Sequence, residues 1–326
     1  MAPNGTEIVG SFVRALNYRI ILVQVFVCVF LCINVFLILT FVMKEYFYTV
    51  MRYILFAVTL FSDCLYLIIT DMLLILTYFS FTLQMWLCLI IYVVSSVYTF
   101  VTPFTLTAMV LERYVAICIP LCHAELCTMR TTLHLILLIH CFSSVPCIFT
   151  TSILFALAPH TFYTTGRVCS VEMFILYTWQ GHLRSATSQF YFLIMCILIV
   201  FSYIKILKVA KAASGENKKA TWKGLRTVIL HSFQLLLCLT QLLCPFIEAA
   251  VLQIDLTLFK NIRYFNYIAF NLAPRCLSPL IYGLRDDLFF QAVKHNALCG
   301  FHSLVHPPTN GGKVHCSHRL PLLWRH

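Results

Sequence analysis

Charged side chains are scarce in this chain, and those in or beside long apolar runs are the strongest candidates for chemistry. Glu112-Arg113-Tyr114 directly follows the uncharged run from Met72 to Leu111. Asp63 and Arg275 each lie inside an apolar segment. An ionisable group at membrane depth is costly and marks a functional site by default. The chemistry that these residues can perform is ion pairing, within a membrane or at its edge.

The remaining titratable residues do not form a catalytic or metal-binding set. His134, His140 and His231 lie in apolar segments but share no ligand spacing, so we interpret them as packed core histidines. The C-terminal tail resembles a metal-binding tract, although Pro307-Pro308 and Gly311-Gly312 interrupt any fixed spacing. The tract comprises His302, His306, His315, Cys316 and His318. We therefore predict no enzyme activity, no bound metal and no cofactor.

Long apolar runs supply the elements that must position these charges. Of the 326 residues, 61% are apolar and 11% are charged, a composition that leaves too few polar residues to solvate the surface of a soluble protein. One helical crossing of a bilayer needs about 20 apolar residues. The runs predict an all-α membrane protein with a bundle of seven transmembrane helices. The expected spans are about 20–43, 52–79, 86–112, 132–155, 187–211, 224–250 and 262–283.

The basic residues predict the orientation of the bundle. With the N-terminus outside, most lysines and arginines fall in cytoplasmic segments, as the positive-inside rule requires. Asn4-Gly5-Thr6 is a glycosylation sequon, and its use at Asn4 needs an outer location. Residues 1–19 lack the apolar core of a cleavable signal peptide, so the first span is expected to direct insertion. Topology then explains the net charge of +11, and we expect no nucleic-acid partner.

The segments outside the bundle have separate predicted roles. Residues 1–19 are the expected extracellular N-terminus, and residues 284–298 are expected to form a short amphipathic eighth helix on the membrane surface. Cys299 is placed for palmitoylation at the start of a cytoplasmic tail, 299–326, that we expect to be disordered. The basic loop from Lys205 to Arg226 suits anionic membrane lipids and a protein partner equally well.

Two of the 16 cysteines are expected on the outer face. Cys88 begins the third span and Cys169 lies in the loop after the fourth, whereas most others fall inside spans and act as small apolar residues. Oxidising conditions outside the cell favour a disulfide there. The 25 residues from Cys88 to Arg113 correspond to about 37 Å of helix. Cys88 and Arg113 therefore mark opposite ends of one membrane-crossing helix.

Two motifs carry a family resemblance. The first is Glu112-Arg113-Tyr114 with Pro120 seven residues after the arginine. The second is the segment from Pro274 to Arg285, which is similar to an Asn-Pro-x-x-Tyr helix end with Ser278 in place of the Asn. Together with seven spans and two outer cysteines, these motifs make the chain resemble a rhodopsin-class G-protein-coupled receptor from Ile20 to about His295. The resemblance implies a Cys88–Cys169 disulfide.

Finer features resemble one branch of this class. The strings Ala108 to Leu121 and Ile281 to Arg285 are most similar to odorant receptors, and His123-Ala124-Glu125 is similar to a fish-type branch. This implies a plasma-membrane receptor for a small-molecule odorant that activates a heterotrimeric G protein, of the stimulatory type by resemblance. The alternative is an orphan receptor for a lipid or peptide. A transporter or channel is disfavoured because we find no internal repeat.

The resemblance implies a latch at the inner end of helix three. Glu112 would hold Arg113 at rest and release it toward the G protein on activation, with Tyr114 as the third residue of the motif. The alternative is an interfacial pair with only an anchoring role. Many class members complete the latch with an acid on helix six, but here only Glu216, in the loop, can substitute. We therefore predict a weak resting lock and basal signalling.

Four further residues are implied as parts of the switch. Tyr203 and Tyr282 match tyrosines that bridge the cytoplasmic helix ends in active receptors, although either can be an ordinary interfacial aromatic. Pro245 and Pro279 permit kinks in helices six and seven. The usual tryptophans of helices four and six are absent, which distinguishes the chain from amine and peptide receptors.

Asp63 matches the aspartate of the family's sodium site, but Arg275 stands where that site usually has a small polar residue. A buried guanidinium needs a carboxylate partner, and Asp63 is the nearest candidate, with Asp71 as the rival. We hypothesise an Asp63–Arg275 ion pair that replaces the sodium ion and leaves ligand affinity insensitive to sodium. The alternative is an unpaired Arg275 in a polar cavity.

The ligand pocket is expected in the outer half of the bundle, between helices three, five, six and seven. Its lining should be mostly apolar with a few hydroxyls, which suits small, weakly polar molecules. Plain helix packing remains the alternative for each residue. The candidates are Ser95, Ser96, Thr99, Phe100, Phe246, Ala249, Ala250, Tyr264, Ile268 and Leu272.

Overall fold

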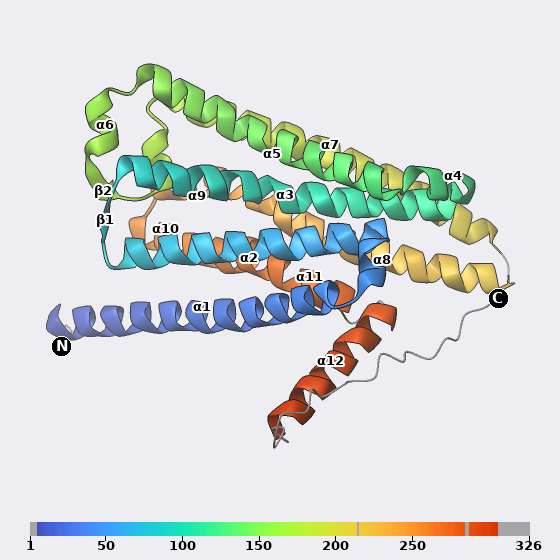
Figure 1. Cartoon of the computed structure of the whole chain (residues 1–326). Coiled ribbons are helices and arrows are strands. Elements are labelled where there is room, and N and C mark those ends of the chain that lie inside the picture. Colours follow the sequence, from blue (N-terminus) through green and yellow to red (C-terminus); the bar gives the residue numbers. More distant parts are fainter. Residues whose placement is uncertain (1–4, 214, 284–286, 306–326) are drawn as a thin grey trace.

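The computed structural model describes residues 5–213, 215–283 and 287–305, and its long helices lie side by side in one bundle (Figure 1). In a bilayer every backbone polar group must be satisfied within the chain, so apolar runs of this length fold as helices. Five helices among the described residues are long and apolar enough to cross a membrane. They are α1 (Gly5–Val42), α2 (Met51–Tyr78), α3 (Met85–Cys118), α5 (Met129–Leu157) and α7 (Thr178–Ala212).

The last two crossings are interrupted. The sixth consists of α8 (Gly215–Gln241) and α9 (Cys244–Leu252), and the seventh of α10 (Leu256–Asn266), the π-helical segment η3 (Tyr267–Leu272) and α11 (Ala273–Gly283). Pro245 lies in the first turn of α9, where the missing N–H of proline does no harm. Pro279 lies inside α11.

Helix ends in the structure differ from the spans read from the sequence. α1 begins at Gly5 and α7 at Thr178, well before the predicted starts at 20 and 187. Apolar runs locate the part of a helix that lies in the membrane, whereas the hydrogen-bonded helix continues beyond it through more polar residues. Thr128 caps α5, because its hydroxyl accepts the N–H of Thr131 at 3.2 Å.

Short elements connect the long helices. At the end that holds the loop after α5, strand β1 (Thr82–Gln84) pairs antiparallel with β2 (Gly166–Val168), with Thr82 opposite Val168. The same loop contains α6 (His160–Thr164) and η2 (Val171–Phe174). At the other end, η1 (Glu45–Tyr48) joins α1 to α2, and α4 (Pro120–Leu126) joins α3 to α5.

The core is centred on α3, which contacts α2, α5, α7 and α8. Its largest apolar cluster contains Phe56 of α2, Met109 of α3, Met195 of α7 and Leu235 of α8, each at most 1% exposed. Many large apolar side chains on the outer surface remain exposed, as expected for a surface that faces lipid. α3 is therefore the central helix of the bundle.

The final helix, α12 (Asp287–Val305), leaves the bundle at an angle (Figure 1). Its Phe289 ring packs against Phe47 of η1 and Phe56, with centroid distances of 5.3 and 5.4 Å. α12 extends past the predicted end of the amphipathic helix at 298, as far as Val305. The sequence of α12 contains no proline, and Pro307 disfavours helical backbone at the residue before it. Asn4 and the tail 306–326 lie outside the described residues, as does the side chain of Cys299, which falls within α12.

Candidate functional site

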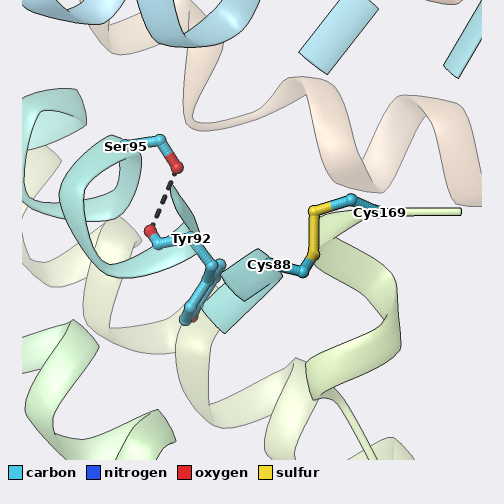
Figure 2. The surroundings of a disulfide bond; sticks show 4 residues. All are labelled: Cys88, Tyr92, Ser95 and Cys169. Atoms are coloured by element: carbon cyan, nitrogen blue, oxygen red, sulfur yellow. Dashed lines mark hydrogen bonds between the residues drawn. A yellow bond between two sulfur atoms is a disulfide. The ribbon is translucent and has the colours of Figure 1, made fainter. Parts of the chain in front are cut away.

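A disulfide fixes one end of α3. Cys88, in the first turn of α3, is bonded to Cys169, which follows β2, and their Cα atoms are 5.6 Å apart (Figure 2). Both residues are buried, and the backbone N–H of Met85 donates to the carbonyl of Thr165 at 3.1 Å. A cross-link that closes a long loop restricts the unfolded chain and so stabilises the fold. The loop after α5 is thereby held over this end of the bundle.

At the other end of α3, Glu112 lies between a guanidinium and an imidazole. Its Oε2 is 3.6 Å from Nε of Arg113, and its Oε1 is 3.4 Å from Nε2 of His123 in α4. Glu112 is buried at 7% exposure, whereas Arg113 is 20% exposed. Neither Glu112 Oε2 nor Arg113 Nε makes a hydrogen bond. The Glu112–Arg113 pair is therefore a loose ion pair.

Two of the predicted switch tyrosines pack together near this end of α3. Tyr114 and Tyr203 pack against an apolar cluster of Val110, Ile206 and Leu225, which joins α3, α7 and α8. Pro279 is buried in α11. The side chains of Tyr282, Pro245 and Glu216 lie outside the described part of the structure.

A second ion pair lies in the middle of the bundle. Nη1 of Arg275, in α11, is 2.8 Å from Oδ1 of Asp63, in α2, and these side chains are 2% and 0% exposed. Thr102 of α3 donates to the same carboxylate oxygen at 2.8 Å and accepts from Arg275 at 3.0 Å. Ser278 donates to the other oxygen at 3.1 Å. The rival Asp71 instead accepts a hydrogen bond from Gln24 of α1.

Two glutamines extend this cluster to the sixth crossing. Gln234 of α8 donates to the hydroxyl of Ser278 and, at 3.1 Å, to the carbonyl of Pro274. Gln241, at the end of α8, donates to the hydroxyl of Tyr66, which donates to Asn271 at 2.7 Å.

The Tyr66 ring also lies 3.6 Å from the guanidinium carbon of Arg275, close enough for a cation–π interaction. A buried ion pair offsets its desolvation only when its remaining hydrogen-bonding groups are satisfied. The hydrogen bonds from Thr102 and Ser278 meet that condition for Asp63. Crossings two, three, six and seven are thus joined in one polar network, which a sodium ion would have to displace.

The predicted pocket residues of α3 make contacts within α3 and with α7. The Ser95 hydroxyl donates to the carbonyl of Tyr92 at 3.0 Å (Figure 2), and Thr99 donates to the carbonyl of Ser95 at 2.8 Å. Phe100 is buried against the ring of Tyr191 in α7, with centroids 5.6 Å apart. Ser96 is half-buried.

The predicted pocket residues of the seventh crossing pack against α1. Tyr264, Ile268 and Leu272 pack in a cluster with Val23 and Val27 of α1. Ala250 of α9 is exposed, and the side chains of Phe246 and Ala249 lie outside the described residues. Among the described residues, the predicted pocket side chains of α3 and of the seventh crossing therefore pack against different neighbours, because helical depth alone does not fix the direction of a side chain.

Two functional candidates were missed from the sequence. Glu248 of α9 accepts a hydrogen bond from Asn266 of α10 at 3.0 Å, and it is an acid inside a predicted span, which is the signal that identified Asp63. His123 follows Glu112 by eleven residues, and only the fold of α4 brings the two together.

Comparison with known proteins identifies this arrangement. Residues 14–282 match the family described as "7 transmembrane receptor (rhodopsin family)". The chain is also 40% identical over 289 residues to "Odorant receptor 131-2" of Danio rerio, a match that covers 89% of each chain. The first motif, the Ser278–Tyr282 part of the second, the disulfide and the central network lie within the matched range.

Proposed function

Because the chain belongs to the rhodopsin family of seven-transmembrane receptors, we propose that it is an odorant receptor that activates a stimulatory heterotrimeric G protein. As a member of this family it is a multi-pass membrane receptor with a ligand and a G protein as partners, and it is not an enzyme. The transporter and channel alternatives are thereby excluded. The odorant role rests on the 40% identity to the zebrafish receptor.

The arrangement of α3 supports signalling across the membrane. One helix carries the disulfide at one end and the Glu112–Arg113 pair at the other. Thr102, between them, donates to the Asp63 carboxylate in the central network. A ligand that moves α3 or the seventh crossing would shift helices that this network holds together, and would so change the environment of Arg113 at the inner end of α3.

The proposed orientation places the N-terminus and the disulfide outside the cell and α12 inside. Asn4 is then available for glycosylation, and Cys299 of α12 is near the inner membrane surface for palmitoylation. The ligand site lies in the outer half of the bundle, and Glu248, Asn266 and Ser96 are its best candidate polar contacts. Glu248 has only a hydrogen bond from Asn266 among the described residues, so its carboxylate can accept a further donor from a ligand.

The test is a cAMP assay in cells that express the receptor together with a stimulatory G protein. A panel of small odorants, with lipids and short peptides as separate arms, should give a response to at least one odorant. Arg113→Ala should abolish that response without loss of surface expression, and Arg130→Ala, which removes an exposed arginine from α5, should not. Responses only to lipids or peptides would favour the orphan-receptor alternative.

A further inference from the structure

A small cavity lies between α5 and α7, at the disulfide end of the bundle and outside the proposed ligand site. Its volume is about 130 Å³. The two helices run antiparallel, and the Tyr191 hydroxyl donates to the carbonyl of Phe142 at 3.0 Å just beyond the cavity, closer to the middle of the membrane. This contact joins the two helices on the inner side of the cavity, so we expect an occupant to enter from the outer half of the bilayer or from the outer surface.

One wall of the cavity holds a buried amide with an unused donor. Gln180 of α7 is 6% exposed and lines the cavity. Its carbonyl oxygen accepts the backbone N–H of Leu176 at 2.7 Å and of Tyr177 at 3.2 Å, which fixes the orientation of the carboxamide. The amide nitrogen has no hydrogen-bond partner among the described residues. It is therefore available to an acceptor inside the cavity.

The second donor is a guanidinium one helical turn away. Arg184 follows Gln180 by four residues, so both side chains lie on the same face of α7. Arg184 is half-buried and lines the cavity, and its guanidinium has no ion-pair or hydrogen-bond partner in the described part of the chain. An unpaired cation beside an apolar cleft favours an anionic partner.

The opposite wall is mainly apolar. Pro146, Phe149 and Ile153 of α5 recur on it at the spacing of one helix face, next to Val145 and Thr150. The Thr150 hydroxyl donates to the carbonyl of Pro146. An apolar cavity of about 150 Å³ holds a molecule the size of benzene, so this cavity fits about six heavy atoms. A phospholipid, with two long chains, is too large. The site therefore suits a small molecule with one anionic head group and a short hydrocarbon body.

From these features we propose that the α5–α7 cavity binds a short-chain aliphatic carboxylate. The guanidinium of Arg184 and the amide N–H of Gln180 hold the carboxylate, and the hydrocarbon chain packs on Phe149 and Ile153. An arginine is suited to this role because its parallel N–H groups match the two oxygens of a carboxylate. The site is separate from the odorant pocket, and it does not depend on the odorant function.

The test uses the full-length receptor in nanodiscs of phosphatidylcholine and a diazirine-bearing analogue of butanoate as the probe. Light should attach the probe to peptides that contain residues 145–153 and 180–187. Sodium butanoate, whose six heavy atoms match the cavity, should compete with it, and butan-1-ol, of the same chain length but uncharged, should compete at least tenfold more weakly. Arg184→Gln should reduce labelling about tenfold, as expected for one charge-assisted contact. Arg167→Gln, which removes an exposed arginine from β2, is the matched control.

Three results would overturn the proposal: unchanged labelling of Arg184→Gln, equal competition by butan-1-ol, or attachment to peptides of α3, α9 or α10 instead. Thermal unfolding establishes that the variant is folded. A second variant, Ile153→Trp, fills the cavity and leaves both donors in place. It should lose labelling, and retained labelling would also count against the site. Failure of these experiments would leave the cAMP response to odorants unaffected, so the two proposals are tested separately.

Discussion

The two ion pairs of the bundle each join an arginine to a carboxylate, but one pair is loose and partly exposed and the other is close and buried. Arg113 and Glu112 approach to 3.6 Å at the membrane edge, with no hydrogen bond between the two facing atoms, and Arg113 is 20% exposed. Arg275 and Asp63 approach to 2.8 Å with no access to solvent, and Thr102 and Ser278 hydrogen-bond the carboxylate. The difference suggests that the first pair can open during signalling, whereas the second maintains the packing of the helices.

The largest effect is expected from breaking the central pair. Arg275→Met removes the cation and leaves the Asp63 carboxylate buried without a counter-ion, which costs about 3–5 kcal/mol. We expect loss of surface expression and a lower unfolding temperature in detergent. The double variant Asp63→Asn/Arg275→Met removes both charges and should recover part of the loss. Arg167→Met is the control, and a single Arg275 variant as stable as that control would disprove the structural role.

A smaller effect, on activity and not on stability, is expected at the inner pair. Glu112→Gln removes the charge that restrains Arg113, so basal cAMP should rise severalfold above the wild-type level at equal surface expression. Glu125→Gln neutralises an exposed acid of neighbouring α4 and should leave basal cAMP unchanged. The wild-type receptor should itself signal above empty vector, because its latch lacks a hydrogen bond. A silent wild type would contradict the weak lock.

His123 should contribute less than Arg113 to the restraint of Glu112. Its imidazole is 37% exposed and 3.4 Å from the carboxylate, and partly exposed ion pairs contribute about 0–1 kcal/mol. We expect His123→Ala to change basal cAMP in the same assay by less than Glu112→Gln does. The variant Glu112→Gln/His123→Ala should match Glu112→Gln alone, since His123 acts through Glu112. A further change in the double variant would show a separate role for the histidine.

Sodium is expected to have no effect on the ligand affinity or the stability of the receptor. The Arg275 guanidinium already lies against the Asp63 carboxylate, so a sodium ion has no free charge to bind there. Replacing choline chloride by sodium chloride at constant ionic strength should leave both the ligand affinity and the unfolding temperature of the purified receptor unchanged. A stabilisation by sodium that Asp63→Asn abolishes would contradict the hypothesis that Arg275 replaces the sodium ion.

The sequence predicted the fold more completely than the candidate site. Apolar runs identified the membrane-crossing segments, and family membership confirms the predicted receptor fold of seven helices. The last helix extends past the predicted end at 298, as far as Val305. For the ligand site, helical depth was estimated from spacing, but Tyr264, Ile268 and Leu272 turn toward α1. The π-helical segment η3 lies within this crossing and changes which residues share a face.

By itself, the sequence determined which residues lie at membrane depth and which of them are charged, because hydropathy and spacing are local properties of the chain. It also supplied the motif residues Glu112 and Arg113. Only the tertiary structure decided that Arg275 meets Asp63 instead of Asp71, that His123 reaches Glu112, and that Arg184 and Gln180 face an apolar wall of α5. These pairings depend on the rotation and register of helices packed far from one another in sequence, and no local pattern encodes them.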